Sequence, residues 1–469
     1  MITSLALVLF GNLTKAPPNF VVILCDDLGI GDLSCYGNKR FQTKNIDKLA
    51  NEGVRFTDFY VASPACTPSR AALLTGCYPT RVSLPQVLSP DSKIGLNPNE
   101  TTLPEILKQK GYSTGIFGKW HLGVHNLMPL VHGFDEYFGL PYSNDMWPPN
   151  GKFWGNLFLY DNNTKVKEIK TFDDQCKLTE TLTQKAVNFI EQNKKKQFFL
   201  YLPHPMPHVP LAASDKNRGK SKLGLYVDTI KDIDDSVGTI VNKLKQLNLD
   251  KNTMVVFLSD NGPWRPYGNH AGSPGEFREG KGTTFEAGMR VPGIFWGPGL
   301  ISSGKVNHEL VTAMDILPTM TAMASGTLPT NKIDGHDILP ILQSQPGATT
   351  PYKWFYYFWP DELQAVRSGK WKLHVPHNHR HQIEPAGKDG EPAGEVTEKI
   401  GLSLYNLETD PGETKNVAED HPDIVSRMLR MIQIGRNELG DKITKTKGSE
   451  VRAPGEVIFP PQPADIKKL

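Results

Sequence analysis

The sequence predicts an α/β fold in which helices sandwich a large, mixed but mostly parallel sheet, with a smaller C-terminal α+β domain on an antiparallel sheet. Two observations predict it. Short β-branched or aromatic runs alternate with helix-like stretches along most of the chain. After a stretch rich in Pro, Gly and Thr at residues 343–351, the pattern changes to alternating aromatic and polar positions. With 469 residues, 38% of them hydrophobic, the chain can bury a core in each of two domains.

Five strands of the main sheet are expected where apolar runs are rich in β-branched and aromatic residues. They span residues 20–25, 113–117, 198–202, 253–259 and 292–296. Between them, Asn45 is a suitable N-cap for a short helix that ends at Glu52. Residues 228–247 carry apolar side chains at helical spacing and predict a longer helix.

The C-terminal part has its own pattern. Residues 352–373 alternate as an antiparallel sheet does, and residues 423–439 have the period of a closing amphipathic helix. Residues 378–399 are rich in Gly, Pro and charge and predict an exposed loop near the cleft. The expected division is a signal-peptide remnant at residues 1–16, a catalytic domain at residues 17–345 and a C-terminal subdomain at residues 346–469.

The charge and the N-terminus limit the partners and the location. The 52 Lys and Arg residues and 50 Asp and Glu residues give a net charge of +2, which supplies no long-range field for nucleic acid. The apolar run at residues 2–10 lacks a basic leader and is too short to span a bilayer, so it predicts a weak or trimmed signal peptide. We expect an exported protein (periplasmic, secreted or lysosomal) without stable membrane insertion.

Polar side chains follow four of the predicted strands. In chain order they are Asp26 and Asp27, Lys119 and His121, His208, and Asp260 and Asn261. One such pair would more often be a helix cap or a turn. Because ligands of open α/β sheets bind beyond the carboxyl ends of the strands, four such groups at one edge indicate a site.

The acidic members of this set predict a metal. Three carboxylates and an Asn carbonyl are hard oxygen donors that suit Ca²⁺ or Mg²⁺ rather than zinc, and we expect calcium. Three crowded anions would cost several kcal/mol unless a cation compensated them or their pKa values rose.

The segment at residues 63–81, SPACTPSRAALLTGCYPTR, carries the most specific signal. Pro68 and the apolar residues after it place Cys66 at or just before a helix N-terminus. The helix dipole, free amides and Arg70 would stabilise an oxyanion on residue 66 or a sulfate bound there. The alternative for a lone Cys is a small buried hydrophobe.

This segment resembles the signature of type I sulfatases, which belong to the alkaline phosphatase superfamily. The resemblance extends over nearly the whole chain, through residues 26–29 (DDLG), 66–76 (CTPSRAALLTG), 118–123 (GKWHLG), 259–262 (SDNG), 280–286 (GKGTTFE) and 404–407 (LYNL). Among relatives, the sequence looks most like the arylsulfatase A and N-acetylgalactosamine-6-sulfatase branch.

The resemblance implies that a formylglycine-generating enzyme oxidises Cys66 to formylglycine, whose hydrated aldehyde is a geminal diol. One hydroxyl would attack sulfur and form a sulfo-enzyme, and the other would collapse to the aldehyde and expel sulfate. Arg70 would steady the diol. The resemblance also implies one Ca²⁺ held by Asp26, Asp27, Asp260 and Asn261 and contacting an oxygen of residue 66.

The remaining catalytic roles follow from the same resemblance. Lys119 and Lys281 would bind sulfate oxygens and stabilise the charge of the transition state. His121 would be the base for sulfate expulsion and His208 the proton donor to the leaving alcohol, although a surface histidine is the alternative for either. Ser143 would contact sulfate; its alternative is a turn residue.

Substrate choice is expected to depend on loops at this edge of the sheet. The candidates are Asn269 and His270, and His377 within a histidine-rich tract that could instead bind a metal or line a solvated loop. Trp147, Trp154 and Trp264 could stack on a sugar ring. These features favour a sulfated carbohydrate over a small aryl sulfate.

Two other functions stay open. One is a phosphonate or phosphate diester hydrolase of the same superfamily, against which Lys119, His121 and Lys281 argue. The other is a noncatalytic relative that binds sulfated glycans. A homodimer is a further expectation that the sequence leaves open.

Overall fold

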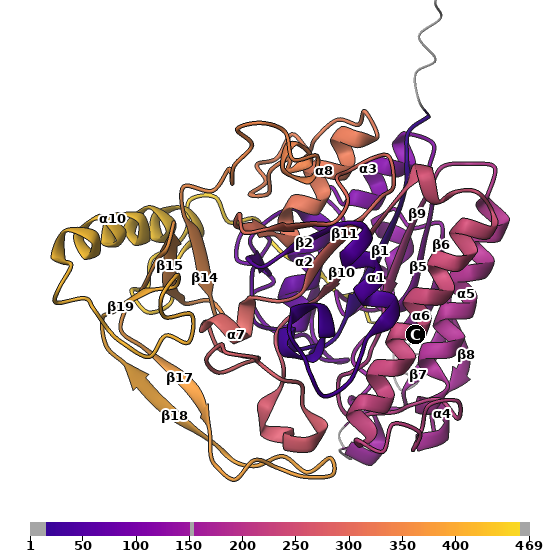
Figure 1. Cartoon of the computed structure of the whole chain (residues 1–469), viewed down its shortest axis with the longest axis horizontal. Coiled ribbons are helices and arrows are strands. Elements are labelled where there is room, and N and C mark those ends of the chain that lie inside the picture. The colour runs from indigo at the N-terminus through magenta and orange to yellow at the C-terminus, as the bar shows by residue number, and fades with distance from the viewer. Residues whose placement is uncertain (1–15, 151–153, 460–469) are drawn as a thin grey trace, which may run out of the picture.

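The computed structural model describes residues 16–150 and 154–459. The expected signal remnant at residues 1–16 therefore lies, apart from its last residue, outside the described residues. In the part of the chain that is described, ten strands form one central sheet (Figure 1). Their spatial order is β12 (Lys305–Asn307), β2 (Val54–Phe56), β11 (Gly293–Trp296), β10 (Thr253–Ser259), β1 (Asn19–Cys25), β9 (Phe198–Pro203), β5 (Ser113–Lys119), β6 (Glu136–Leu140), β7 (Phe158–Asp161) and β8 (Thr164–Glu168).

The centre of this sheet is parallel. Strands β10, β1, β9, β5 and β6 run in the same direction, whereas β11 on one side and β7 on the other pair antiparallel to their neighbours. All five strands expected from the sequence are present, so the predicted mixed, mostly parallel sheet is confirmed. The carboxyl ends of the five parallel strands, β10, β1, β9, β5 and β6, lie at the same edge.

Helices cover both faces because the side chains of β1 alternate between two apolar cores. Phe20, Val22 and Leu24 belong to one core, and Val21, Ile23 and Cys25 to the other. The first core includes residues of α2 (Cys66–Thr75), α3 (Leu103–Gln109) and α8 (Ile316–Met323), and the second includes residues of α1 (Lys44–Glu52), α5 (Leu178–Asn193) and α6 (Leu225–Gln246).

The start of α1 differs from the prediction. The helix begins at Lys44, and Asn45 lies inside it. The main-chain and side-chain nitrogens of Asn45 each donate to Asp234 of α6 at 3.0 Å. Asn45 is therefore not a helix cap: a tertiary partner uses its hydrogen-bonding groups.

A second, antiparallel sheet lies in the C-terminal part of the chain. It consists of β14 (Phe355–Phe358), β15 (Leu363–Ser368), β16 (Trp371–His374) and β19 (Ser403–Asn406), and α10 (Pro422–Leu439) packs against it (Figure 1). This confirms the predicted fold class, including the closing helix. A domain boundary near residue 345 stays a prediction.

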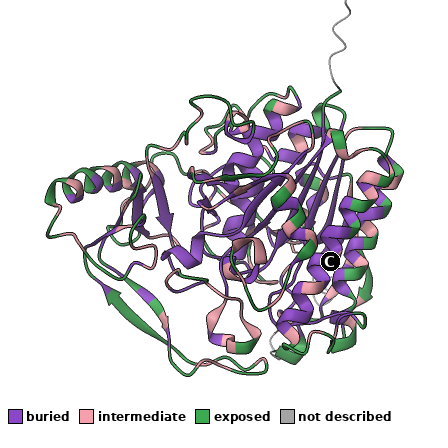
Figure 2. Ribbon diagram, in the orientation of Figure 1, coloured by how far each residue is buried: buried purple, intermediate pink, exposed green. Residues whose placement is uncertain are grey.

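The loop expected at residues 378–399 is wrong in part, because its two ends are strands. β17 (His377–Gln382) and β18 (Glu395–Ile400) pair antiparallel as a hairpin whose outer side is exposed (Figure 2). His377 and His379 are buried, whereas Asn378 and Arg380 between and beyond them are exposed. The alternation of a strand is present, but it was hidden because both of its faces carry polar residue types.

Short elements complete the described fold. They are β3 (Phe59–Tyr60), β4 (Ile94–Gly95), β13 (Val311–Thr312), β20 (Gly455–Glu456), α4 (Phe172–Cys176), α7 (Glu286–Met289) and α9 (Leu339–Leu342). Across residues 16–150 and 154–459, none of the helices combines the length and the apolar character that crossing a bilayer would require.

Candidate active site

The predicted convergence of polar groups at the carboxyl edge of the sheet is present. Asp26 follows β1, Asp260 follows β10, and Lys119 is the last residue of β5. Lys119 Nζ lies 2.5 Å from Asp26 Oδ2, and both side chains are fully buried. Arg70 of α2 donates to Asp26 at 3.1 Å and to Asp260 at 2.7 Å.

Arg70 therefore ties two strand ends to the helix that carries Cys66. Its third nitrogen, Nη1, donates to the Lys119 carbonyl at 2.8 Å, so each guanidinium nitrogen has an acceptor. The geometry makes Arg70 a positioning residue for the carboxylates. Direct contact of Arg70 with the side chain of residue 66 stays a prediction.

Asp27 is the centre of the other half of the cluster. Lys281 Nζ lies 2.8 Å from Asp27 Oδ1, and Asn261 Nδ2 donates to the same oxygen at 2.7 Å. His208 Nε2 lies 3.6 Å from Asp27 Oδ2. His208 follows β9, whereas Asn261 and Lys281 follow β10, so the fold brings these three groups together at the sheet edge.

The electrostatics of the cluster differ from the sequence argument. Three cations, the buried Arg70 and Lys119 and the partly buried Lys281, balance the three carboxylates through direct ion pairs. Charge crowding by itself therefore does not require a metal. Burial raises the pKa of Asp26, but the charges of Lys119 and Arg70 outweigh burial and hold that pKa well below its ordinary value. Burial, helped by the charge of Asp26, raises the pKa of Asp260.

Two unpartnered oxygens give a second test of whether the residues fit a cation. Asp26 Oδ1 and Asn261 Oδ1 are buried and have no hydrogen-bond partner among the described residues. A buried oxygen without a donor is costly, and a hard cation would satisfy both oxygens at once. Single ligand atoms of Asp26, Asp27 and His208 also lie within 4.8 Å of one another. The residues present therefore fit a calcium ion.

Cys66 is the first residue of α2, as the position of Pro68 predicted. Its side chain is buried, and burial raises the pKa of the thiol even though Lys119 and Lys281 lower it. Thr67, the next residue, donates to the His121 carbonyl at 3.0 Å and accepts from the Leu88 amide at 3.1 Å. Thr67 thus fixes the helix start against the loop that carries His121, a role the sequence analysis missed.

The hydrogen bonds of His121 define its tautomer. Nε2 lies 2.7 Å from the Leu88 carbonyl, and because a carbonyl only accepts, Nε2 carries the hydrogen. Burial, together with the charge of Lys119, lowers the pKa of His121, so the ring is neutral and Nδ1 is unprotonated. Nδ1 is buried and has no partner within the described chain. It is a free proton acceptor.

Backbone strain is concentrated at this edge. Asp27 and His121 have left-handed conformations, with φ of 64° and 60°, which cost about 1–2 kcal/mol for a residue with a Cβ. Gly118 precedes Lys119 at a point where a Cβ would lie 2.0 Å from the Pro203 carbonyl oxygen. Only glycine permits β5 and β9 to approach this closely at the position that directs Lys119 into the site.

A pocket of about 350 Å³ opens over this cluster. Its lining includes Cys66, His121, Ser143, His208 and Lys281, five of the residues expected from the sequence. Ser143 is buried and accepts a hydrogen bond from Lys119 Nζ at 3.1 Å, which joins Lys119 to the same site.

The chain matches known families over most of its length. Residues 18–327 match a family model described as sulfatase, and residues 350–451 match one described as the C-terminal region of aryl-sulfatase. The chain belongs to the sulfatase family. It is a sulfuric ester hydrolase, as the residues at 66–76 indicated.

Two curated relatives and one solved structure show how far the similarity extends. The sulfatase is 37% identical to arylsulfatase A of Bos taurus, and the aligned region covers 92% of this chain and 89% of the relative. It is also 37% identical to N-acetylgalactosamine-6-sulfatase of Mus musculus, covering 89% and 86%. The crystal structure of PsFucS1 sulfatase from Pseudoalteromonas sp. superposes with a TM-score of 0.81 at 29% identity, covering 89% of each chain.

The pocket of this sulfatase also includes residues that the sequence analysis did not select. They are Ala65, Gln86, Val87, Asp145, Met146, Gly282, Trp359, Pro360 and Arg380. Trp264, which the sequence suggested as a residue that could stack on a sugar ring, lines the pocket as well. Trp359 follows β14 and Arg380 lies on β17, so the C-terminal sheet and its hairpin supply one wall. A basic residue within the histidine-rich tract was the only available signal for Arg380.

The structure does not bring three predicted substrate residues into the pocket of the sulfatase. Asn269 exchanges hydrogen bonds with Asp389 of the hairpin at 2.8 Å, and His270 lies beside it. His377 is buried, and its Nδ1 bonds to the Val375 carbonyl at 2.7 Å. The residue of this tract that reaches the pocket is Arg380, because side chains of β17 alternate between its two faces.

Proposed function

We propose that this sulfatase hydrolyses sulfate monoesters of a carbohydrate through a formylglycine made from Cys66, with one bound Ca²⁺. The observation that carries the proposal is the shared pocket, in which Cys66 lies among His121, His208, Ser143 and Lys281. A residue at a helix N-terminus, facing two histidines and a lysine, suits attack on an anionic ester.

The state of the thiol supports the need for modification. Because burial raises its pKa, unmodified Cys66 would remain a neutral thiol at neutral pH and a poor nucleophile. A maturation enzyme that converts it to formylglycine would supply a hydrated aldehyde, which presents an oxygen nucleophile in place of sulfur.

Sulfate binding is assigned to three groups of the chain. Lys281 and Ser143 line the pocket, and Lys119 reaches it through its hydrogen bond to Ser143. Burial lowers the pKa of Lys281, but the charge of Asp27 outweighs burial and keeps the ammonium charged. A fixed positive charge in a site with little water stabilises the negative charge that grows on sulfate oxygens in the transition state.

Proton transfer is assigned to the two histidines. His121 holds an unprotonated Nδ1 and would take a proton as sulfate is expelled. His208 donates from Nδ1 to the Val209 carbonyl at 2.6 Å, and its Nε2 faces Asp27 at 3.6 Å. A second proton on Nε2, stabilised by the Asp27 carboxylate, would pass to the leaving alcohol. The charged neighbour distinguishes the two rings, because His208 faces a carboxylate whereas the ammonium of Lys119 acts on His121.

Asp26, Asp27, Asp260 and Asn261 would hold Ca²⁺, which would polarise a sulfate oxygen. We expect Ca²⁺ added to the metal-free protein to raise its melting temperature, because a ligand at a hundred times its Kd adds about 2.7 kcal/mol of stability. Mg²⁺ should give a smaller shift, since it retains its water ligands. Differential scanning calorimetry of the wild type and Asn261→Leu measures this effect, and equal shifts for both metals or both proteins would refute the assignment.

The carbohydrate part of the proposal rests on the wall of the pocket. Trp264 and Trp359 offer aromatic faces of the kind that stack on sugars, and Arg380 offers a cation beyond the sulfate-binding lysines. The name of the mouse relative, N-acetylgalactosamine-6-sulfatase, describes action on a sulfated sugar.

Arg380→Ala is expected to leave kcat/KM for 4-nitrophenyl sulfate unchanged and to lower kcat/KM for the preferred sulfated saccharide about tenfold, the value of one charged hydrogen bond. Arg380 pairs only loosely with Glu395, at 3.7 Å, so its removal leaves no buried charge. Arg430→Ala, an exposed arginine on α10, is the matched control. An equal loss on both substrates would indicate a structural role instead.

Parallel assays test the reaction itself. The mature protein is offered 4-nitrophenyl sulfate, bis(4-nitrophenyl) phosphate and a panel of sulfated saccharides, and mass spectrometry of the residue-66 peptide reports its conversion. Preference for the diester would support the phosphodiesterase alternative. Saccharide binding without turnover by fully converted protein would support the noncatalytic alternative. Export and a homodimer stay proposals, which fractionation and light scattering would test.

A further inference from the structure

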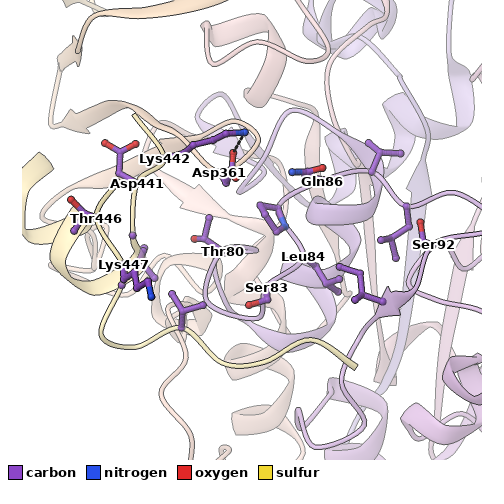
Figure 3. Close-up of a pocket in the computed structure, with 18 of the residues that line it drawn as sticks. Thr80, Ser83, Leu84, Gln86, Ser92, Asp361, Asp441, Lys442, Thr446 and Lys447 are labelled. Carbon is purple, nitrogen blue, oxygen red and sulfur yellow. Dashed lines mark ion pairs between the residues drawn. The ribbon is translucent and has the colours of Figure 1, made fainter. Parts of the chain in front are cut away.

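A second cavity, of about 730 Å³, has no role in the mechanism above (Figure 3). Its labelled residues come from three segments that are far apart in the sequence. They are Thr80, Ser83, Leu84, Gln86 and Ser92, then Asp361, and finally Asp441, Lys442, Thr446 and Lys447. The loop after α2 and the loop after α10 thus face each other across it.

The two cavities are neighbours that share part of their lining. Gln86 and Val87 line both of them, and the side chains of both residues are exposed. On the opposite side, Pro360 lines the catalytic pocket and Asp361 lines the second cavity. A molecule that extends from the catalytic pocket into the second cavity would therefore pass over the exposed side chains of Gln86 and Val87.

The charge of the second cavity favours an anion. Lys93, Lys442 and Lys447 line it. Of its two acids, Asp441 is already paired with Arg436 at 2.7 Å, and Asp361 lies 3.4 Å from Lys442. Within residues 16–150 and 154–459, Lys447 makes no ion pair. Because Asp441 pairs with a residue outside the lining, the three lysines face one available carboxylate, Asp361, and the cavity keeps an excess of positive charge. Lys442 is 62% exposed, so its pair with Asp361 is a weak one.

The rest of the lining suits a sugar. Pro85, Val87 and Val451 present apolar surface, while Thr80 and Ser83 contribute hydroxyl groups. A pyranose has the same mixture, with C–H faces and a rim of hydroxyls. The cavity is about twice as large as the catalytic pocket, which at about 350 Å³ accommodates little more than one sulfated unit.

We propose that the second cavity binds the neighbouring units of an anionic oligosaccharide whose sulfated sugar occupies the catalytic pocket. Lys442 and Lys447 bind a sulfate or carboxylate group of that extension. The inference rests on the proposed function, because it extends the substrate of the same site. The enzyme then acts on sulfated chains in preference to single sugars or aryl sulfates.

The test compares a sulfated tetrasaccharide with the sulfated monosaccharide that corresponds to its terminal unit. Two such pairs of ligands are used, one derived from chondroitin 6-sulfate and one from a sulfated galactan. The double variant Lys442→Ala/Lys447→Ala is compared with Lys399→Ala/Lys415→Ala, two exposed lysines outside both cavities. The measurements are kcat/KM, the calorimetric Kd of each saccharide and turnover of 4-nitrophenyl sulfate.

The wild type and the control variant should prefer the better tetrasaccharide to its monosaccharide in Kd and kcat/KM. The Lys442/Lys447 variant should lose about tenfold on the tetrasaccharide, since each exposed charge contact is worth up to about fivefold. Its turnover of 4-nitrophenyl sulfate should not change. Equal binding of both lengths by the wild type, or a preference that survives in the variant, overturns the inference. If the wild type does not hydrolyse 4-nitrophenyl sulfate, that result counts against the proposed function alone. The Kd values of the saccharides still report whether the second cavity binds them.

Discussion

Cys66→Ser is expected to lower turnover of 4-nitrophenyl sulfate by roughly 10³-fold or more, because a serine hydroxyl lacks the second oxygen that would release the sulfated enzyme. For this experiment, both proteins are produced in a host whose maturation enzyme converts cysteine and not serine. The fold should persist, since serine is close in size to cysteine and is well tolerated at the first position of a helix. Steady-state assays and circular dichroism melts measure the two effects.

Cys35→Ser is the matched control for this substitution. Cys35 is half-buried, lies outside the catalytic pocket and contacts Asp47 through its main-chain nitrogen at 2.9 Å. Its turnover should stay within about twofold of the wild type, as for most substitutions away from a site. Substantial activity in Cys66→Ser, with residue 66 shown by mass spectrometry to be unmodified serine, would count against the mechanism.

Lys372→Met is expected to lower the free energy of unfolding by about 3–5 kcal/mol, the cost of leaving buried charge without its partner. Lys372 is fully buried between two carboxylates, Glu286 at 3.0 Å and Glu413 at 2.8 Å. Glu286 begins α7, a short distance along the chain from Lys281 of the pocket, so this ammonium joins the C-terminal sheet to the catalytic part of the chain. Guanidinium titration followed by fluorescence measures the loss.

The pH dependence of this loss is a second readout. Burial already raises the pKa of Glu413 to about 7, and removing Lys372 would raise it further. Burial also acts on Glu286, but the charges of Lys372, Arg290 and Arg367 outweigh it and hold that pKa below its ordinary value, so removing Lys372 would move it upward as well. The folded variant then holds protons that the unfolded chain releases above pH about 4.5, so its stability falls as the pH rises from there. Lys370→Met, a partly exposed lysine two residues earlier, should change stability by less than about 1 kcal/mol. A similarly small loss for Lys372→Met would refute the argument.

Local patterns account for how much of the fold could be predicted. Strand β1 reads as a strand from FVVILC alone, and α2 begins where Pro68 indicates, because both signals lie within a few neighbouring residues. The hairpin of β17 and β18 was missed because polar residue types occupy both the buried and the exposed positions of β17, so no alternation of apolar and polar residues marks the strand. Asn45 was misassigned because its partner, Asp234, lies 189 residues away.

By itself, the sequence indicated the reaction class of this sulfatase. Several residues of the catalytic edge directly follow a strand, and Cys66 begins a helix. Such positions are encoded by short-range periodicity. Only the tertiary structure decided which charges pair, as Arg70 does with Asp260 across 190 residues, and which distant segments supply Arg380 and the second cavity. The physical reason is that these contacts form between side chains far apart in the sequence. The residues next to each partner in the chain therefore do not indicate which partner it will contact.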